Sequence, residues 1–120
     1  MAEILGLGGV SIRCIDADAY RRWWLNYMEV DITAWGTMEW PHLDDGPSRT
    51  VLGIYDNNTY YFEPSEQRVM INLRTDNVVA MLEQAEEGGA QILGARETND
   101  GIFGWFIDPE GYKIELWQEH

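Results

Sequence analysis

The chain has 120 residues, which suits one domain with a real hydrophobic core and leaves no room for a second domain of ordinary size. It carries 21 acidic against 8 basic residues, and the net charge of −13 disfavours binding to nucleic acid and to anionic membranes. Cys14 is the only cysteine, so no disulfide can form within the chain.

The N-terminal segment 1–10 lacks the basic flank and the long apolar stretch of a signal peptide. No apolar run in the sequence is long enough to cross a bilayer. Together with the single cysteine, these features favour a cytoplasmic protein that does not bind membranes.

The first half of the chain predicts a strand, a helix and three more strands. Apolar and polar residues alternate over 7–16, which is typical of a half-buried strand. Asp16 or Asp18 is placed to cap the next helix, where aromatic residues recur at helical spacing over 18–28. Glycine and proline interrupt segment 36–48, which predicts a loop. The remaining strands of this half are predicted at 30–35, 49–55 and 58–63.

The second half repeats this order. Segment 70–75 alternates like a strand, and 76–89 predicts a helix that two glycines end. The turn DPEG at 108–111 precedes the last strand, because proline favours its second position and glycine its end. Strands are predicted at 90–95, 101–107 and 112–117.

An internal repeat is visible at individual positions. Aligning the two halves matches Ser11 with Asn72, and Arg13 with Arg74. The same comparison matches Glu63 with Glu115. We therefore predict an α+β fold with two βαβββ modules, about 5–64 and 68–118, in a single domain spanning 1–120. Their strands would form a curved mixed sheet around a shared cavity, with the helices on its outer face.

The whole chain resembles the vicinal oxygen chelate superfamily, which includes glyoxalase I, extradiol dioxygenases and the fosfomycin- and bleomycin-resistance proteins. Segment 108–118, DPEGYKIELWQ, is similar to the final-strand signature of that family. Segment 10–30 is similar to its opening strand and helix, with Trp23 and Trp24 at the usual aromatic pair. Met28 and Glu29 stand where the family usually has Leu-Gly.

The resemblance also implies four positions for divalent metal ligands, from the first and last strand of each module. In chain order these positions fall on Gly9, Glu63, Met70 and Glu115. Glycine has no side chain, and a thioether is poorly suited to hard metals. Because only Glu63 and Glu115 can ligate, we expect no cofactor, and a divalent metal held by these two carboxylates is the alternative. His42 and His120 lie at no ligand position.

The role of the two carboxylates stays open at this stage. Either could act as a general base if burial and a like charge raise its pKa. Alternatively, Arg13 and Arg74 could pair with the acids and fill the cavity, because strand alternation places both on the side that faces it. Aromatic walls with few charges are typical of small-molecule pockets. The candidate ligand-binding residues are Arg13, Trp35, Tyr61, Glu63, Arg74, Glu115 and Trp117.

These features predict a small-molecule-binding protein, similar to the bleomycin-resistance branch, that sequesters a cationic or aromatic organic compound. The alternative function is a divalent-metal-dependent lyase, isomerase or dioxygenase that uses Glu63 and Glu115. A third hypothesis is a scaffold whose cavity is closed by Arg–Glu pairs and whose function lies in a partner interface. The resemblance also implies a homodimer.

Overall fold

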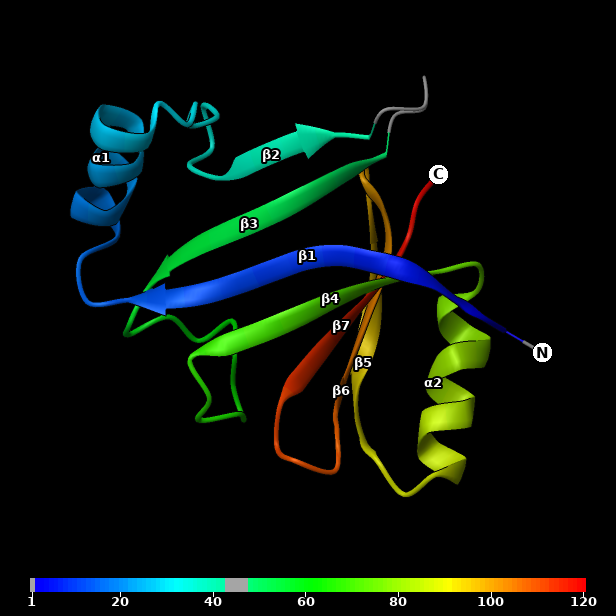
Figure 1. Ribbon diagram of the computed structural model, residues 1–120. Coiled ribbons are helices and arrows are strands. Elements are labelled where there is room, and N and C mark those ends of the chain that lie inside the picture. Colours follow the sequence, from blue (N-terminus) through cyan, green and yellow to red (C-terminus); the bar gives the residue numbers. More distant parts are fainter. Residues whose placement is uncertain (1, 43–47) are drawn as a thin grey trace.

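The computed structural model describes residues 2–42 and 48–120, which form one seven-stranded sheet and two helices (Figure 1). The strands are β1 (Ile4–Cys14), β2 (Met38–Pro41), β3 (Arg49–Asp56), β4 (Val69–Thr75), β5 (Gln91–Thr98), β6 (Gly101–Ile107) and β7 (Lys113–Gln118). The helices are α1 (Ala17–Met28) and α2 (Val78–Glu87). Neither helix in these described ranges is long and apolar enough to cross a membrane.

The sheet is mixed, with the strand order β2-β3-β1-β4-β7-β6-β5. β1 pairs in parallel with β3, and β4 pairs in parallel with β7. The antiparallel pairing of β1 with β4 joins the two halves of the chain into one sheet. This confirms the predicted α+β class and the curved mixed sheet, which bends so that β5, β6 and β7 are seen nearly edge-on in Figure 1.

Two irregularities interrupt the β1–β4 pairing at the centre of the sheet. The register shifts between Ile4 and Gly6 and again between Leu7 and Gly9. Gly6 and Gly9 have positive φ angles of 154° and 145°, and a Cβ on Gly9 would lie only 1.8 Å from the carbonyl oxygen of Val51. Bulges of this kind bend a strand and increase its twist.

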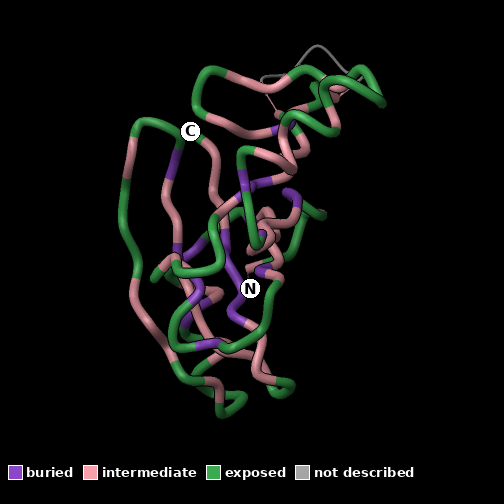
Figure 2. The backbone as a smooth tube through the Cα atoms, turned by 90° about the vertical axis from the view of Figure 1, so that its left-hand side faces the viewer, coloured by how far each residue is buried: buried purple, intermediate pink, exposed green. Residues whose placement is uncertain are grey.

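The alternation along β4 and β7 separates a core face from a polar face. Ile71 and Leu73 on β4 and Ile114 and Leu116 on β7 pack in the apolar cluster that also contains Val78 of α2. The intervening residues therefore point to the opposite face of the sheet. In Figure 2 the buried stretches lie along strands, whereas the connecting turns are largely exposed.

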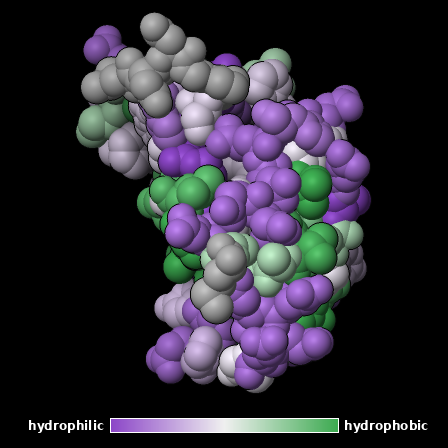
Figure 3. All heavy atoms as spheres, turned by 90° about the vertical axis from the view of Figure 1, so that its right-hand side faces the viewer, coloured by the Kyte–Doolittle hydropathy of each residue, from purple (hydrophilic) through white to green (hydrophobic). Residues whose placement is uncertain are grey.

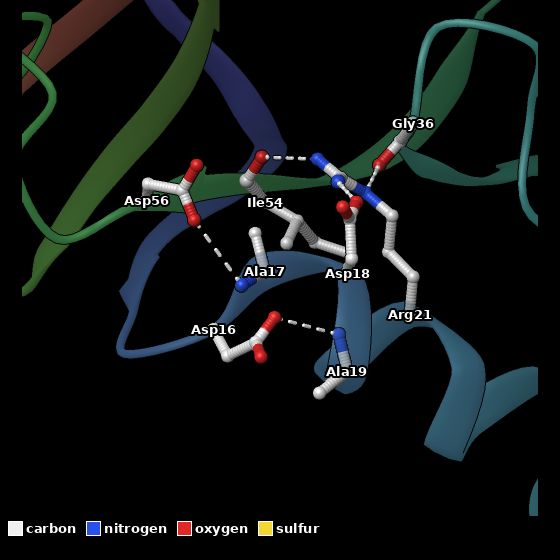
Figure 4. A network of polar contacts seen from close by, with 8 residues as sticks. All are labelled: Asp16, Ala17, Asp18, Ala19, Arg21, Gly36, Ile54 and Asp56. Carbon is white, nitrogen blue, oxygen red and sulfur yellow. Dashed lines mark hydrogen bonds and ion pairs between the residues drawn. The ribbon is translucent and has the colours of Figure 1, made fainter.

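Helix α1 is fixed to β3 by polar contacts at its N-terminus (Figure 4). Of the two predicted caps, Asp16 is the N-cap, and its side chain accepts a hydrogen bond from the Ala19 N–H. Arg21 donates to the carbonyl oxygens of Gly36 at 2.8 Å and of Ile54 at 2.9 Å. These bonds hold the turn at Gly36 close to β3, and the segment after that turn enters strand β2.

The strand predicted at 30–35 is wrong. These residues form no strand, and Val30 and Ile32 instead pack against the apolar cluster beneath α1. The sheet edge is supplied by β2, which lies inside the segment predicted as a loop. Positions 43–47 of that predicted loop lie outside the described residues.

The strand predicted at 58–63 is also wrong, because this segment folds into consecutive turns. The Thr59 N–H donates to the Asp56 carbonyl, and the Glu63 N–H donates to the Tyr60 carbonyl. The side chain of Phe62 is fully buried and Tyr60 is 81% exposed, so the segment is anchored by one ring and not by a strand ladder. The strands predicted around 7–16, 49–55, 70–75, 90–95, 101–107 and 112–117 and both helices are confirmed, with shifted ends.

Candidate functional site: an acidic, aromatic cleft

A cleft of about 790 Å³ lies on the sheet face opposite α2. Both halves of the same chain contribute to its lining. Its lining residues come from β1 (Gly8, Val10, Ser11), β2 (Glu39), β3 (Arg49, Val51, Gly53, Tyr55), β4 (Asn72), β6 (Phe103), β7 (Glu115, Trp117) and the segments Trp35, Thr37, Tyr61, Asn99, Asp100, Glu119 and His120.

Glu115 belongs to this lining and is only 6% exposed. One carboxylate oxygen accepts a hydrogen bond from the Asn72 side-chain amide at 2.7 Å. The other accepts hydrogen bonds from the Trp105 indole N–H at 2.8 Å and from the Tyr61 hydroxyl. Three uncharged donors thus stabilise a buried carboxylate, as burial of a charge requires.

The carboxylate changes the acidity of the neighbouring phenols. Burial raises the pKa of Tyr61 far above its usual value, and the charge of Glu115 and the hydrogen bond to it raise it further. Burial, followed by the charge of Glu115, also raises the pKa of Tyr55. Tyr61 is therefore a neutral hydrogen-bond donor across the physiological pH range.

Aromatic rings form a nearly continuous wall along the cleft. Tyr55 stacks on Tyr61 with ring centroids 5.3 Å apart, and Tyr61 meets Trp105 edge-to-face. Phe103 stacks between Trp105 and Trp117, at 6.4 Å and 5.9 Å. The electron-rich faces of such rings attract both aromatic ligands and cations.

The charged groups of the lining are mostly acidic. One carboxylate oxygen of Glu39 accepts hydrogen bonds from the Trp35 indole and the Thr37 hydroxyl, both at 2.6 Å. Arg49 lies 4.0 Å from the other Glu39 oxygen. Asp100 and Glu119 add two more carboxylates, whereas Arg49 is the one arginine of the lining.

The structure brings together four of the seven predicted ligand-binding residues. Trp35, Tyr61, Glu115 and Trp117 line the cleft. Glu63 does not, because it lies exposed on the turn after Tyr61.

Neither predicted arginine plugs the cleft. Arg13 donates to the Ser65 carbonyl at 3.3 Å and lies over the Phe62 ring, away from the lining. Arg74 lies outside the lining, and its Nε is 3.8 Å from a carboxylate oxygen of Glu119. The expected Arg–Glu pairing at Glu115 is thus replaced by neutral donors.

The strand register explains why Glu63 is not the counterpart of Glu115. Asn72 pairs with Glu115 across the parallel β4–β7 ladder. Its repeat partner Ser11 pairs with Gly53 across the equivalent β1–β3 ladder. The position equivalent to Glu115 is therefore Gly53, where an added Cβ would lie 2.5 Å from the Ser11 hydroxyl.

The described residues do not fit a divalent metal site of the superfamily type. Met70 is fully buried and lines no part of the cleft, and Gly9 offers no side chain. Both oxygens of Glu115 already accept hydrogen bonds from neutral donors. Over residues 2–42 and 48–120, no group of three or more His, Cys, Asp or Glu side chains is placed to hold a metal.

Asn72, Tyr55, Glu39 and Phe103 were missed as site residues by the sequence prediction. Asn72 alone had a usable signal, because the repeat places it on the cavity-facing parity. Gly8 makes room for its amide, since a Cβ there would lie 1.9 Å from the Asn72 Oδ1. That oxygen is buried and accepts no hydrogen bond from the described residues.

Comparison with known families identifies the fold independently. Residues 9–117 match the family model described as a glyoxalase-like domain, so the chain belongs to this family within the vicinal oxygen chelate superfamily. Among curated proteins, none matches the sequence.

Solved structures show the same fold at low sequence identity. A methylmalonyl-CoA epimerase from Mycobacterium tuberculosis is 17% identical with a TM-score of 0.62, covering 98% of this chain and 89% of the epimerase. A Streptomyces coelicolor methylmalonyl-CoA epimerase variant in complex with 2-nitronate-propionyl-CoA is 15% identical with a TM-score of 0.67, covering 95% and 96%. The Mn(II)-bound glyoxalase from Novosphingobium aromaticivorans is 18% identical with a TM-score of 0.55, covering 98% of this chain and 40% of the glyoxalase. Identities this low indicate a shared fold and leave the activity open.

Proposed function

We propose that the chain binds a small organic cation, with an aromatic or otherwise flat body, in the cleft around Glu115 and without a divalent metal. The observation that carries the proposal is the lining itself, which combines stacked aromatic rings with an excess of carboxylates. A cation there gains both ring-face attraction and the field of the acids.

Preorganisation supports binding over metal chemistry. The three hydrogen bonds to Glu115 fix its carboxylate without neutralising it, so the negative potential persists inside a partly desolvated cleft. The net charge of −13 extends this attraction beyond the cleft and should speed the capture of cations at low salt.

The matched pair benzyltrimethylammonium and benzyl alcohol tests the proposal by isothermal titration calorimetry. We expect saturable binding of the cation, and binding of the neutral alcohol weaker by about 10-fold or more, since one desolvated charged interaction is worth roughly 1.5–3 kcal/mol. Equal affinity for the two compounds would show that charge does not select the ligand and would refute the proposal.

Two substitutions localise the binding. Glu115→Gln should weaken binding of the cation about 10-fold, and Asp100→Asn, on an exposed turn of the lining, should weaken it by a smaller factor. Glu87→Gln removes an equal charge at the exposed end of α2, outside the lining, and serves as the control that should leave the affinity unchanged.

The alternative of a metal-dependent lyase, isomerase or dioxygenase using Glu63 and Glu115 finds no support in the described residues, because Glu63 lies outside the lining. The homodimer implied by the resemblance stays a prediction for sedimentation analysis. One chain by itself supplies residues from both of its halves to the cleft.

A further inference from the structure

A second hollow, of about 640 Å³, adjoins the cleft and has the opposite charge. We call it the lysine groove; it is lined by Thr59, Tyr60, Tyr61, Leu93, Gly94, Ala95, Arg96, Trp105 and Lys113. Tyr61 lines both hollows and so forms the wall between them. The charged side chains of this lining are Lys113 and Arg96, and both are cationic.

Lys113 is the only lysine in the sequence, and it is only 9% exposed. It alternates with Glu115 along β7, so both side chains lie on the same face of that strand. Its ammonium group lies over the rings of Tyr61 and Trp105, at 5.2 Å and 5.7 Å from their centroids. A buried lysine is unusual unless an anion accompanies it.

The described residues give Lys113 no such anion. Its Nζ donates one hydrogen bond, to the Tyr61 carbonyl oxygen at 2.5 Å, although an ammonium carries three N–H donors. Within residues 2–42 and 48–120 it forms no ion pair. Glu115, the nearest acid along β7, has both oxygens engaged by Asn72, Tyr61 and Trp105.

We propose that the lysine groove binds a small aromatic carboxylate. Its carboxylate would pair with the Lys113 ammonium and with the Arg96 guanidinium, and its ring would pack among Tyr60, Tyr61 and Trp105. The exposed Tyr60, at 81%, and the exposed Arg96 supply adaptable groups at the rim, while Lys113 supplies the fixed charge. Leu93 and Ala95 complete an apolar surface for the ring.

A purely structural role for Lys113, as a tie between β7 and the turn at Tyr61, makes a different prediction. In that case added anions would not change the pKa of the amine. In the proposed site, burial lowers the pKa of Lys113, and Glu115 and Glu63 only partly counteract this. A bound carboxylate favours the charged amine, so it should raise that pKa, and affinity should fall as pH rises through it.

Benzoate and its uncharged match, benzamide, are the probes, titrated by calorimetry. The wild-type protein should bind benzoate saturably. It should bind benzamide with an affinity lower by about 10-fold or more. Lys113→Met should weaken benzoate binding about 10- to 100-fold, and Lys113→Arg should retain most of the affinity, because a charge-assisted bond is lost in the first variant only.

Arg96→Gln keeps the proposal testable if Lys113→Met fails to fold, since the Arg96 side chain is exposed. It should weaken benzoate binding about 2- to 5-fold. Arg22→Gln removes the same charge from the exposed surface of α1 and should have no effect. Asp100→Asn, which alters the lining of the cleft but not that of the lysine groove, should not weaken benzoate binding, so the two sites fail or succeed separately.

Because the chain has one lysine, the NMR signal of its ε-methylene is unambiguous. Its titration midpoint should move to higher pH in the presence of benzoate. The proposal is overturned if this midpoint does not move, if wild-type protein shows no saturable benzoate binding, or if benzamide binds equally well.

Discussion

Glu115 shows how a single residue can keep a charge inside an aromatic wall. Its carboxylate accepts hydrogen bonds from Asn72, Tyr61 and Trp105 and forms no ion pair among the described residues. A carboxylate held this way remains an electrostatic attractor for a ligand, whereas an Arg–Glu pair would cancel most of the field.

The alkaline stability of the protein should report the Tyr61–Glu115 contact. The pKa of Tyr61 is raised above its usual value of 10.0, so the folded state holds this proton more tightly than the unfolded state does. The resulting stabilisation is complete below pH 10.0 and is lost as pH rises above it towards the folded pKa. Denaturation by urea between neutral pH and about pH 11, a range that includes the titration of tyrosine in the unfolded chain, measures this loss.

Tyr61→Phe should lower stability at neutral pH by about 1–3 kcal/mol, because a buried carboxylate loses a donor. It should also flatten the alkaline decline. Tyr27→Phe, at a side chain 71% exposed, is the matched control and should keep the wild-type pH profile. An equally steep decline in Tyr61→Phe and wild type would contradict the assignment.

At the scale of elements, the contact between α2 and β6 depends on a glycine. A Cβ on Gly104 would lie 2.6 Å from Val78 Cγ1 and 3.0 Å from Leu82 Cδ1, both on α2. Gly104→Ala should therefore push the helix outward and cost about 1–3 kcal/mol in the free energy of unfolding.

Gly88→Ala provides the control for this prediction. Gly88 has an ordinary φ of −78°, and its added Cβ would lie 3.4 Å from the nearest atom, the Ala85 carbonyl oxygen. Both substitutions change the entropy of the unfolded chain in the same way, so their difference isolates the packing. Equal denaturation midpoints for the two variants would show that α2 adjusts without cost.

Elements with a strong period were predictable from sequence, and those set by tertiary contacts were not. The alternation in β4 and β7 and the glycine stop of α2 are local signals. Segment 58–63 also alternates, yet burial of the Phe62 ring and two turn hydrogen bonds override that preference. Aligning Glu63 with Glu115 relied on this false strand, which is why half of the predicted acid pair lies outside the cleft.

At the scale of the molecule, the excess of acids should make stability depend on salt. With a net charge of −13, repulsion among carboxylates opposes the compact state. Figure 3 shows the face that carries α2, where hydrophilic residues predominate between smaller hydrophobic groups. Glu83, Glu86 and Glu87 of α2 are exposed, so added ions can screen their charge.

Raising sodium chloride from about 10 mM to about 150 mM should raise the Tm, because the screening length falls from about 30 Å to about 8 Å. Differential scanning calorimetry at constant pH measures the change. Sucrose at matched osmolality is the control, since it adds no ions. A Tm that stays constant or falls with salt would indicate that ion pairs outweigh the repulsion.

The glycine bulges of β1 affect the width of the cleft and not the chemical character of its lining. They bend β1, whose pairing with β4 joins the two halves of the sheet, whereas the charged and aromatic groups of the cleft lie on other strands and on connecting segments. A change at Gly6 or Gly9 would therefore alter the angle between the halves without changing which charged and aromatic side chains line the cleft. In this chain the bend of β1 therefore bears on the size of ligand that the cleft admits, and the side chains of the lining bear on the charge of that ligand.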